Sequence, residues 1–161
     1  MKISFLEPHL KIFGGIRRII ELANRLSKRS HDVTIFHADG SPCKLMKCIA
    51  KVSSYDEILD KTHNVIIYNN PNHVGYNLIE KAKAKLKVFY VLGLYEKSLL
   101  KGSNPKIYLP WNKRMLFVKK SLRSPYLKLT NSTWLYCWLR NDMHINSELL
   151  FGMAQFRYYQ V

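Results

Sequence analysis

The chain has 161 residues and a mass of 18.9 kDa, 47% of its residues are hydrophobic, and it contains only 7 glycines and 6 prolines. This composition predicts one globular domain with a substantial core, and it excludes a disordered chain, a collagen-like repeat and a linker-rich assembly. The 26 basic and 11 acidic residues leave a formal net charge of +15, so we expect an anionic partner: a phosphate-bearing ligand, a nucleic acid or an anionic membrane.

The first forty residues predict a strand, a helix and a second strand. Lys2–Leu6 is a short apolar run, Glu7–Gly15 is a loop that ends in two glycines, and Ile16–Lys28 has apolar residues at helical spacing on one face. Val33–Phe36 is a second apolar run. A unit of this kind predicts two parallel strands joined by a right-handed crossover.

The alternation of strands and helices continues along the chain. Further strands are predicted at Cys48–Val52, Val65–Tyr68, Val88–Leu92, Leu127–Thr130 and Glu148–Phe151. Further helices are predicted at Tyr55–Leu59, His73–Lys85 and Thr133–Arg140, the last with Ser132 as its N-cap. Gly102–Arg123 predicts an insertion with one short helix around Lys113–Leu122. The pattern indicates an α/β fold, a Rossmann-like open, mainly parallel sheet with helices on both faces.

The two glycines that close the first loop are the main candidate site. Ligands of open parallel sheets bind beyond the carboxyl ends of the strands. Gly14 and Gly15 allow close approach of the backbone, and the helix from Ile16 offers free N–H groups and a positive dipole end to a phosphate or an acidic sugar. A tight turn into the helix is the competing interpretation. The segment matches neither GxGxxG nor GxxxxGK[ST], which argues against a nicotinamide enzyme and a P-loop NTPase.

Polar residues elsewhere are secondary candidates. Asn69 and Asn70 follow a predicted buried strand and can hydrogen-bond a sugar, although Asn-Asn-Pro is also an ordinary turn sequence, and the turn is the favoured interpretation. His9 is a candidate because it lies in the first loop. The other histidines are expected at the surface or in structural roles: His31, His37, His63, His73 and His144.

The cysteines and the absent motifs narrow the class of protein. Cys43, Cys48 and Cys137 are odd in number and form no CxxC pair, which favours reduced thiols in the cytoplasm and indicates no zinc site. We find no signal peptide, and no apolar run approaches the roughly 18 residues of a membrane span. HExxH and GxSxG are absent, so zinc proteolysis and nucleophilic hydrolysis have no support. We therefore expect a cytoplasmic protein without a metal, able to lie on the inner face of the membrane.

Positive charge is concentrated in the second half of the chain. Nine Lys or Arg residues and no carboxylate lie between Lys97 and Lys128. This segment can face an anionic membrane, bind single-stranded nucleic acid through its interleaved aromatic rings, or form a solvated basic surface. The membrane is favoured over nucleic acid because no RNP, KH or helix-turn-helix signature is present. The candidate basic patch consists of Lys113, Arg114, Lys119, Lys120 and Arg123.

The order of these segments resembles the start of GT-B glycosyltransferases of glycosyltransferase family 4. The resemblance rests on Met1-Lys2-Ile3-Ser4-Phe5, Gly14-Gly15-Ile16-Arg17-Arg18, Glu21-Leu22-Ala23-Asn24-Arg25-Leu26 and His31-Asp32-Val33-Thr34-Ile35. Farther on, Tyr90-Val91-Leu92-Gly93-Leu94-Tyr95-Glu96 resembles a strand-to-loop segment of rhamnosyltransferase-like members. Thr130-Asn131-Ser132 and Phe151-Gly152 resemble segments near the end of the family's first domain.

The resemblance implies a transferase with two Rossmann-like domains. Residues 1–150 would form the acceptor-side domain and residues 151–161 the start of the interdomain linker, while the E-x7-E motif of the donor domain is absent from this sequence. Gly14, Gly15 and Ile16 would lie near the donor phosphates and the acceptor. Many members have a histidine where this chain has Gly93, so the catalytic residue stays unassigned, with Tyr95 and Glu96 as neighbouring candidates. The resemblance also implies retention at the sugar, no obligatory metal, and no cofactor besides the nucleotide-sugar substrate.

Two hypotheses from different classes follow. The leading hypothesis is the acceptor-side domain of a glycosyltransferase that transfers a sugar from a nucleotide-sugar donor to a saccharide or lipid-linked acceptor, as in the synthesis of a cell-surface polysaccharide or glycolipid. We expect this domain to need its donor-binding partner domain and to be inactive alone. The alternative is a basic, non-enzymatic α/β module that binds nucleic acid.

Overall fold

The structure is a computed structural model that describes residues 1–11, 14–44, 46–93 and 109–150, with side chains in the last range described from residue 116. Its strands are β1 (Lys2–Leu6), β2 (Asp32–His37), β3 (Lys51–Ser54), β4 (Thr62–Tyr68), β5 (Lys83–Val91), β6 (Leu127–Thr130) and β7 (Glu148–Leu149). They form one sheet in the order β3-β2-β1-β4-β5-β6-β7, and every neighbouring pair is parallel. The α/β prediction, with its Rossmann-like parallel sheet, is therefore confirmed.

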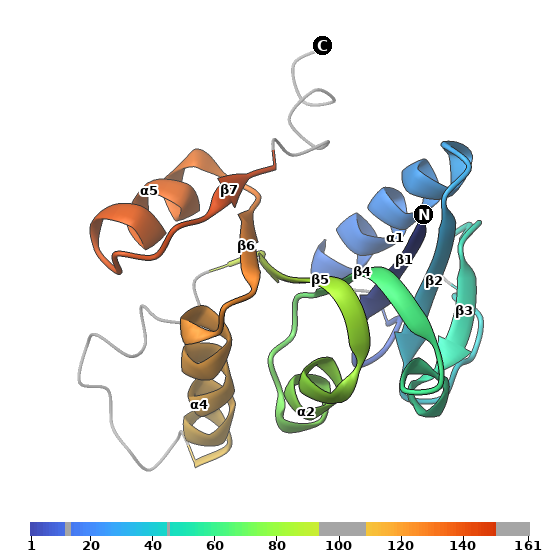
Figure 1. The fold of residues 1–161 in the computed structure, drawn as a ribbon, viewed down its shortest axis with the longest axis horizontal. Coiled ribbons are helices and arrows are strands. Elements are labelled where there is room, and N and C mark those ends of the chain that lie inside the picture. The colour runs from blue at the N-terminus through green and yellow to red at the C-terminus, as the bar shows by residue number, and fades with distance from the viewer. Residues whose placement is uncertain (12–13, 45, 94–108, 151–161) are drawn as a thin grey trace.

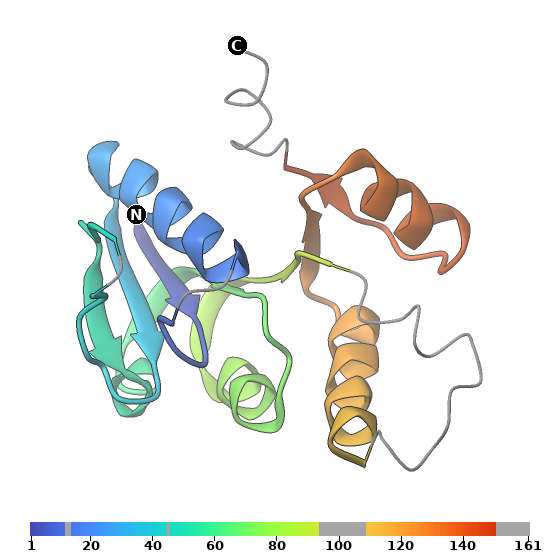
Figure 2. The ribbon, with the colours of Figure 1, turned by 180° about the vertical axis from the view of Figure 1, so that it is seen from behind.

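Helices connect the strands and cover both faces of the sheet (Figure 1). They are α1 (Gly14–Lys28), the 3-10 helix η1 (Tyr55–Ile58), α2 (His73–Lys81), α4 (Leu109–Arg123) and α5 (Thr133–Asn141). Figure 2 shows α1 on the side of the sheet opposite to α2. Ser132 caps α5 as predicted, because its hydroxyl accepts a 3.3 Å hydrogen bond from the amide of Leu135.

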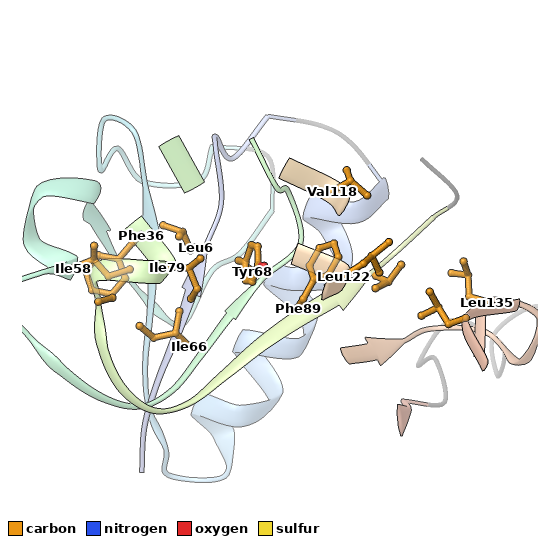
Figure 3. Packing of buried hydrophobic residues seen from close by; sticks show 13 residues of the cluster. Leu6, Phe36, Ile58, Ile66, Tyr68, Ile79, Phe89, Val118, Leu122 and Leu135 are labelled. Atoms are coloured by element: carbon orange, nitrogen blue, oxygen red, sulfur yellow. The ribbon is translucent and has the colours of Figure 1, made fainter. Parts of the chain in front are cut away.

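Two hydrophobic clusters fill the space on either side of the sheet. Beneath α1, the helix buries the isoleucine face predicted from its spacing, with Ile19 and Ile20 almost fully buried against Phe5. The other cluster contains Tyr68 and Phe89, whose rings stack with centroids 5.0 Å apart, together with residues from α2, α4 and α5 (Figure 3). The carboxyl-terminal halves of the central strands β4 and β5, Ile66–Tyr68 and Val88–Val91, are buried on both faces, and they are accordingly apolar.

Several predicted boundaries were wrong, and tertiary contacts explain most of them. Helix α1 begins at Gly14 rather than Ile16, so both glycines belong to its first turn. Helix α2 ends at Lys81 rather than Lys85, because Lys83 and the residues after it pair with β4. Strand β4 accordingly begins three residues earlier than predicted. The insertion holds a longer helix than expected, Leu109–Arg123.

The predicted strand at Cys48–Val52 was also misplaced. Strand β3 begins at Lys51 and continues to Ser54. The side chain of Asn24 on α1 holds the preceding segment: its Nδ2 donates to the carbonyl of Lys47, and its Oδ1 accepts from the amide of Ile49, each at 2.7 Å. With its polar groups bonded to a helix side chain, this segment enters the sheet only after Ala50. The predicted end of the last strand, Phe151, lies outside the described residues.

Candidate functional site

The loops after β1, β4, β5 and β6 begin at the carboxyl edge of the sheet. The strand order reverses at β1: β2 and β3 lie on one side of it, and β4 to β7 lie on the other. A Cβ atom built on Gly15 would lie 3.3 Å from Cδ1 of Leu92 and 3.7 Å from Nδ2 of Asn69. The amide of Asn131 donates a 3.3 Å hydrogen bond to the carbonyl of Leu92. The structure thus brings together two predicted residues, Gly15 and Asn69, and adds Asn131, which the sequence pointed to only as part of a family segment.

The glycine pair lies at the start of α1 with its backbone accessible. Neither Gly14 nor Gly15 has a positive φ, whereas Gly40 does, so a left-handed turn does not explain the pair. A Cβ on Gly14 would meet nothing within 4 Å, so packing does not require glycine there either. The amides of Gly14, Gly15 and Ile16 belong to the first turn, where N–H groups have no partner within the helix. An anion can therefore approach this helix end closely.

The asparagine pair divides between two roles. The carbonyl of Asn70 accepts a 2.8 Å hydrogen bond from the amide of Asn72, and the side chain of Asn72 caps α2 by accepting from the amide of Gly75 at 2.7 Å. Asn70 therefore belongs to the turn into α2, in agreement with the favoured interpretation. Asn69 is buried, with 5% of its surface exposed, and its amide lies toward Gly15. Of the pair, Asn69 is the residue whose side chain lies toward the glycines.

A recess of about 430 Å³ lies beside the first loop, at the carboxyl ends of β1 and β2. We call it the carboxyl-edge recess; its lining residues are His9, Leu10, Lys11, His37, Asp39, Ser41, Pro42 and Lys44. Among the residues predicted for the site, His9 is on its wall. The other lining residues were not predicted, although a run of polar and turn residues after β2 was a signal that this loop lies at the ligand-binding edge.

Glu7, the residue directly after β1, is a buried carboxyl group that was not predicted from the sequence. It is fully buried, and neither carboxyl oxygen has a hydrogen-bond partner among the described residues. Burial raises the pKa of this carboxyl well above its ordinary value. Its backbone is fixed from two sides, because its amide donates to the carbonyl of Phe36 at 2.9 Å and its carbonyl accepts from the hydroxyl of Tyr55 at 2.5 Å. An acidic residue directly after an apolar strand was the available signal.

The remaining predicted residues are only partly described. Tyr95 and Glu96 lie outside the described residues, as do the side chains of Lys113 and Arg114; Gly93 is described and has open space around it. Lys119, Lys120 and Arg123 are exposed or partly exposed on α4. The ammonium of Lys120 lies 5.5 Å from the ring centre of Phe117 and 5.8 Å from that of Tyr76 on α2. Of the described side chains of the basic patch, Lys120 thus lies beside aromatic rings at the α2–α4 contact.

The described part of the chain holds neither a metal-binding cluster nor a membrane-spanning helix. Within residues 1–11, 14–44, 46–93 and 109–150, no group of three or more His, Cys, Asp or Glu side chains is arranged to hold a metal ion. Over the same ranges, no helix is both long enough and apolar enough to span a bilayer.

Comparison with known proteins yields a fold likeness. No protein-family model and no curated sequence matches the chain. Sucrose-phosphate synthase from Thermosynechococcus elongatus superimposes with a TM-score of 0.58 and 12% sequence identity, over 92% of this chain and 47% of that chain. The chain therefore spans about half the length of that protein. A putative transcriptional regulator from Vibrio parahaemolyticus aligns over 94% of this chain and 77% of that one, with 11% identity and a TM-score of 0.42, which is too low to support a conclusion.

Proposed function

We propose that this chain supplies the acceptor-side domain of a GT-B glycosyltransferase. The observation that carries the proposal is the agreement of nearly the whole chain with about half of sucrose-phosphate synthase, a GT-B glycosyltransferase. The accessible glycine pair at the carboxyl edge supports it, because that is where open parallel sheets bind their ligands. The low identity leaves the sugar and the acceptor to be found from the site itself.

In this proposal the first turn of α1 stabilises the leaving group. Transfer breaks the bond between the donor sugar and its nucleoside diphosphate and forms a bond to an acceptor hydroxyl, so negative charge grows on the departing phosphate. The N–H groups of Gly14, Gly15 and Ile16 and the positive end of the helix dipole would bind that charge. Asn69, whose amide lies toward Gly15, would hydrogen-bond a sugar hydroxyl or phosphate oxygen. A partner domain would hold the nucleotide, and no metal or cofactor is proposed.

A charge substitution at the first turn tests this function. In this test the isotope-labelled chain is titrated with UDP-, GDP- and dTDP-linked sugars, and NMR follows its backbone amide signals. The signals of Gly14–Ile16 should shift, and Gly14→Glu should weaken binding at least tenfold, because its carboxylate repels phosphate while a Cβ fits there. Arg25→Glu, near the other end of α1, is the matched control and should bind like the parent chain.

The same samples test whether the chain acts alone. We expect no release of nucleoside diphosphate from any of these donors, with or without saccharide acceptors, because the donor-side E-x7-E motif is absent from the sequence. Detectable turnover would contradict this expectation. Signals at the carboxyl edge that respond to no sugar nucleotide, combined with tight and steeply salt-dependent binding of single-stranded oligonucleotides, would replace the transferase with the nucleic-acid module.

We also propose that the basic patch binds the anionic inner surface of the membrane. Lys119, Lys120 and Arg123 lie on α4 with Leu116, which is 52% exposed, and each such cation contributes about 1 kcal/mol near an anionic surface. Changing the three cations to serine should lower affinity for vesicles of phosphatidylcholine mixed with phosphatidylglycerol about 100-fold. The control changes three exposed lysines near the α2–β5 connection: Lys81, Lys83 and Lys85. Equal binding to phosphatidylcholine vesicles at low salt would remove the membrane from the proposal.

A further inference from the structure

We infer that the acceptor carries a negatively charged group, a phosphate or a carboxylate, and that this group binds in the carboxyl-edge recess between the loops after β1 and β2. The inference rests on the proposed transferase function and specifies its substrate class. With a volume of about 430 Å³, the recess lies within the usual range of small-molecule sites and has room for a charged monosaccharide unit.

The wall of the recess after β2 is fixed in shape. Gly40 has a φ of 67°, and a Cβ there would lie 2.8 Å from the backbone nitrogen of Ser54, so only glycine fits without movement. The side chain of Asp39 accepts a 2.9 Å hydrogen bond from the amide of Ser41. These contacts hold the loop against the end of β3. A preformed wall lowers the entropy lost when a ligand binds.

A buried histidine reinforces this wall from inside the fold. His37 is only 3% exposed, and its Nε2 lies 2.8 Å from the carbonyl oxygen of Ser41, which can only accept, so the ring nitrogen donates. Its Nδ1 lies 3.3 Å from Oδ1 of Asp39. The ring therefore joins the end of β2 to Ser41 on the wall of the recess and lies beside Asp39, so the wall has its shape without a ligand.

The charges of the recess favour an anion. Lys11 and Lys44 are exposed on its wall, one from each loop, and neither ammonium forms an ion pair with a described residue. Asp39 is the one carboxylate among the lining residues, and it already accepts a hydrogen bond from the amide of Ser41. Hydrogen bonds from Ser41 lower the pKa of the Asp39 carboxyl.

Lys11 and Lys44, two lysines without ion pairs, line a fixed, polar wall. A neutral sugar bound there would leave both ammonium groups without an anionic partner. Lys11 lies three residues before the glycine pair, so an acceptor anchored here would have its hydroxyl groups on the same edge of the sheet as the proposed donor phosphates. Charge-assisted hydrogen bonds from lysine to phosphate or carboxylate are about twice as strong as neutral ones. The recess would therefore select charged acceptors over neutral ones and hold them beside the reacting centre.

The test compares three sugars that differ mainly in one group: glucose 6-phosphate, glucuronate and glucose. Each is titrated into the isotope-labelled chain, with inorganic phosphate as a fourth probe. We expect glucose 6-phosphate, glucuronate or both to shift the amide signals of Lys11, Ser41 and Lys44 with at least tenfold higher affinity than glucose. The double variant Lys11→Met/Lys44→Met should lose at least tenfold in affinity for the charged sugar, because the recess keeps its wall but loses its cations.

A matched variant separates a specific site from general positive charge. Lys51→Met/Lys61→Met removes two exposed lysines at the opposite edge of the sheet and should leave affinity for the charged sugar unchanged. Equal binding of glucose and glucose 6-phosphate, or parent-like binding by the recess variant, would overturn the inference. If nucleotide sugars still bind in a Gly14-dependent manner, that outcome leaves the transferase proposal standing. If charged sugars bind the recess while no nucleotide sugar binds, the transferase proposal fails and the acceptor assignment fails with it.

Discussion

A hollow lies at the amino edge of the sheet and another at its carboxyl edge, and the two differ in how many of their polar groups are bonded within the protein. The amino-edge groove, about 250 Å³, is lined by Lys2, Ser4, Asp32, Thr34, Phe36, Lys51, Lys61, Thr62 and His63. Its buried histidine, His63, is fully bonded: Nδ1 lies 2.7 Å from the Ser4 hydroxyl and Nε2 lies 2.9 Å from the carbonyl of Ile58. Two of its lysines are paired as well, Lys51 with Asp32 at 2.9 Å and Lys61 with Glu57 at 2.5 Å.

At the carboxyl edge the corresponding polar groups lack partners. Lys11 and Lys44 have no ion-pair partner among the described residues, and both oxygens of the buried Glu7 are without a hydrogen bond. An exposed lysine without an ion pair is available to an anionic ligand, whereas the buried carboxyl of Glu7, which has no hydrogen bond, lowers stability. In this basic chain neither positive charge nor the lack of an ion pair locates a site by itself; the recess beside Lys11 and Lys44 does. Replacing the buried polar side chain at each edge, His63 or Glu7, should therefore have opposite effects on stability.

The largest effect is expected at the amino edge. His63→Ala should lower the free energy of unfolding by about 3 kcal/mol, because it leaves a cavity beside Phe36 and removes the partners of the Ser4 hydroxyl and the Ile58 carbonyl. Urea unfolding followed by circular dichroism measures the change. His31→Ala, away from the buried network, is the control. A loss below about 1 kcal/mol would mean that the bonds of His63 contribute little; should the variant not fold, Ser4→Ala should show a smaller loss of about 1–2 kcal/mol.

The next effect concerns the wall of the carboxyl-edge recess. Gly40→Ala should cost about 2 kcal/mol, because alanine is strained at a positive φ and its Cβ would collide with the backbone of Ser54. The same unfolding experiment measures it. Gly93→Ala has open space and no positive φ, so it should change stability by less than about 0.5 kcal/mol. Equal effects of the two variants would show that the loop after β2 adapts freely.

Replacing Glu7 should stabilise the fold, in contrast to His63. Glu7→Leu removes a buried carboxyl without partners, and we expect a gain of about 1–2 kcal/mol at pH 8. Its backbone bonds to Phe36 and Tyr55 do not depend on the side chain. Glu148→Gln, at an exposed glutamate, should be close to neutral.

The gain should depend on pH with a definite sign. Burial raises the pKa of Glu7 in the folded state, so the folded chain binds more protons than the unfolded chain at pH values above the ordinary 4.5 of a glutamate. The parent chain therefore loses stability as pH rises from 4.5 toward the raised pKa, by at most about 1.4 kcal/mol per pH unit from this group. Glu7→Leu should remove that slope. A stability difference that shrinks between pH 5 and pH 8 would contradict a buried, unpartnered carboxyl.

The smallest effect is expected for a paired but exposed charge at the amino edge. Asp32 is exposed, and its hydrogen bond and attraction to Lys51 lower its pKa. Its contribution is present at neutral pH and is lost as the pH falls through its lowered pKa, below the ordinary 3.8 of an aspartate. Asp32→Asn should therefore change the free energy of unfolding by less than about 0.5 kcal/mol at pH 7, because exposed pairs are screened by solvent. A larger loss would show that pairing at this edge contributes more than its geometry indicates.

The sequence predicted the elements whose apolar pattern is continuous. Strands β1 and β6 have the predicted bounds, and the parallel arrangement followed from apolar runs separated by helices. The prediction failed at the start of β5, at Lys83–Lys87. Alternating lysines are compatible with a helix surface as well as with a strand, and only the pairing with β4 distinguishes the two. At the site, Gly14, Gly15 and His9 could be proposed because they are local to one loop. Asn131 and His37 could not, since their roles depend on which distant groups approach them, whereas the acidic residue after β1, Glu7, was a signal that the prediction did not use.

The parallel sheet also determines how this chain must fold. Every one of its neighbouring strand pairs is parallel, so no two of the described strands are joined by a hairpin. Each pair can form only after the segment that connects the two strands has crossed over the sheet. Central strand β1 finds its second neighbour, β4, only after about sixty residues have been synthesised. Nascent chains would expose the apolar faces of β1 and β2 during that interval. Because non-local parallel pairings form slowly, the binding edge, which is built from distant loops, is completed late in folding.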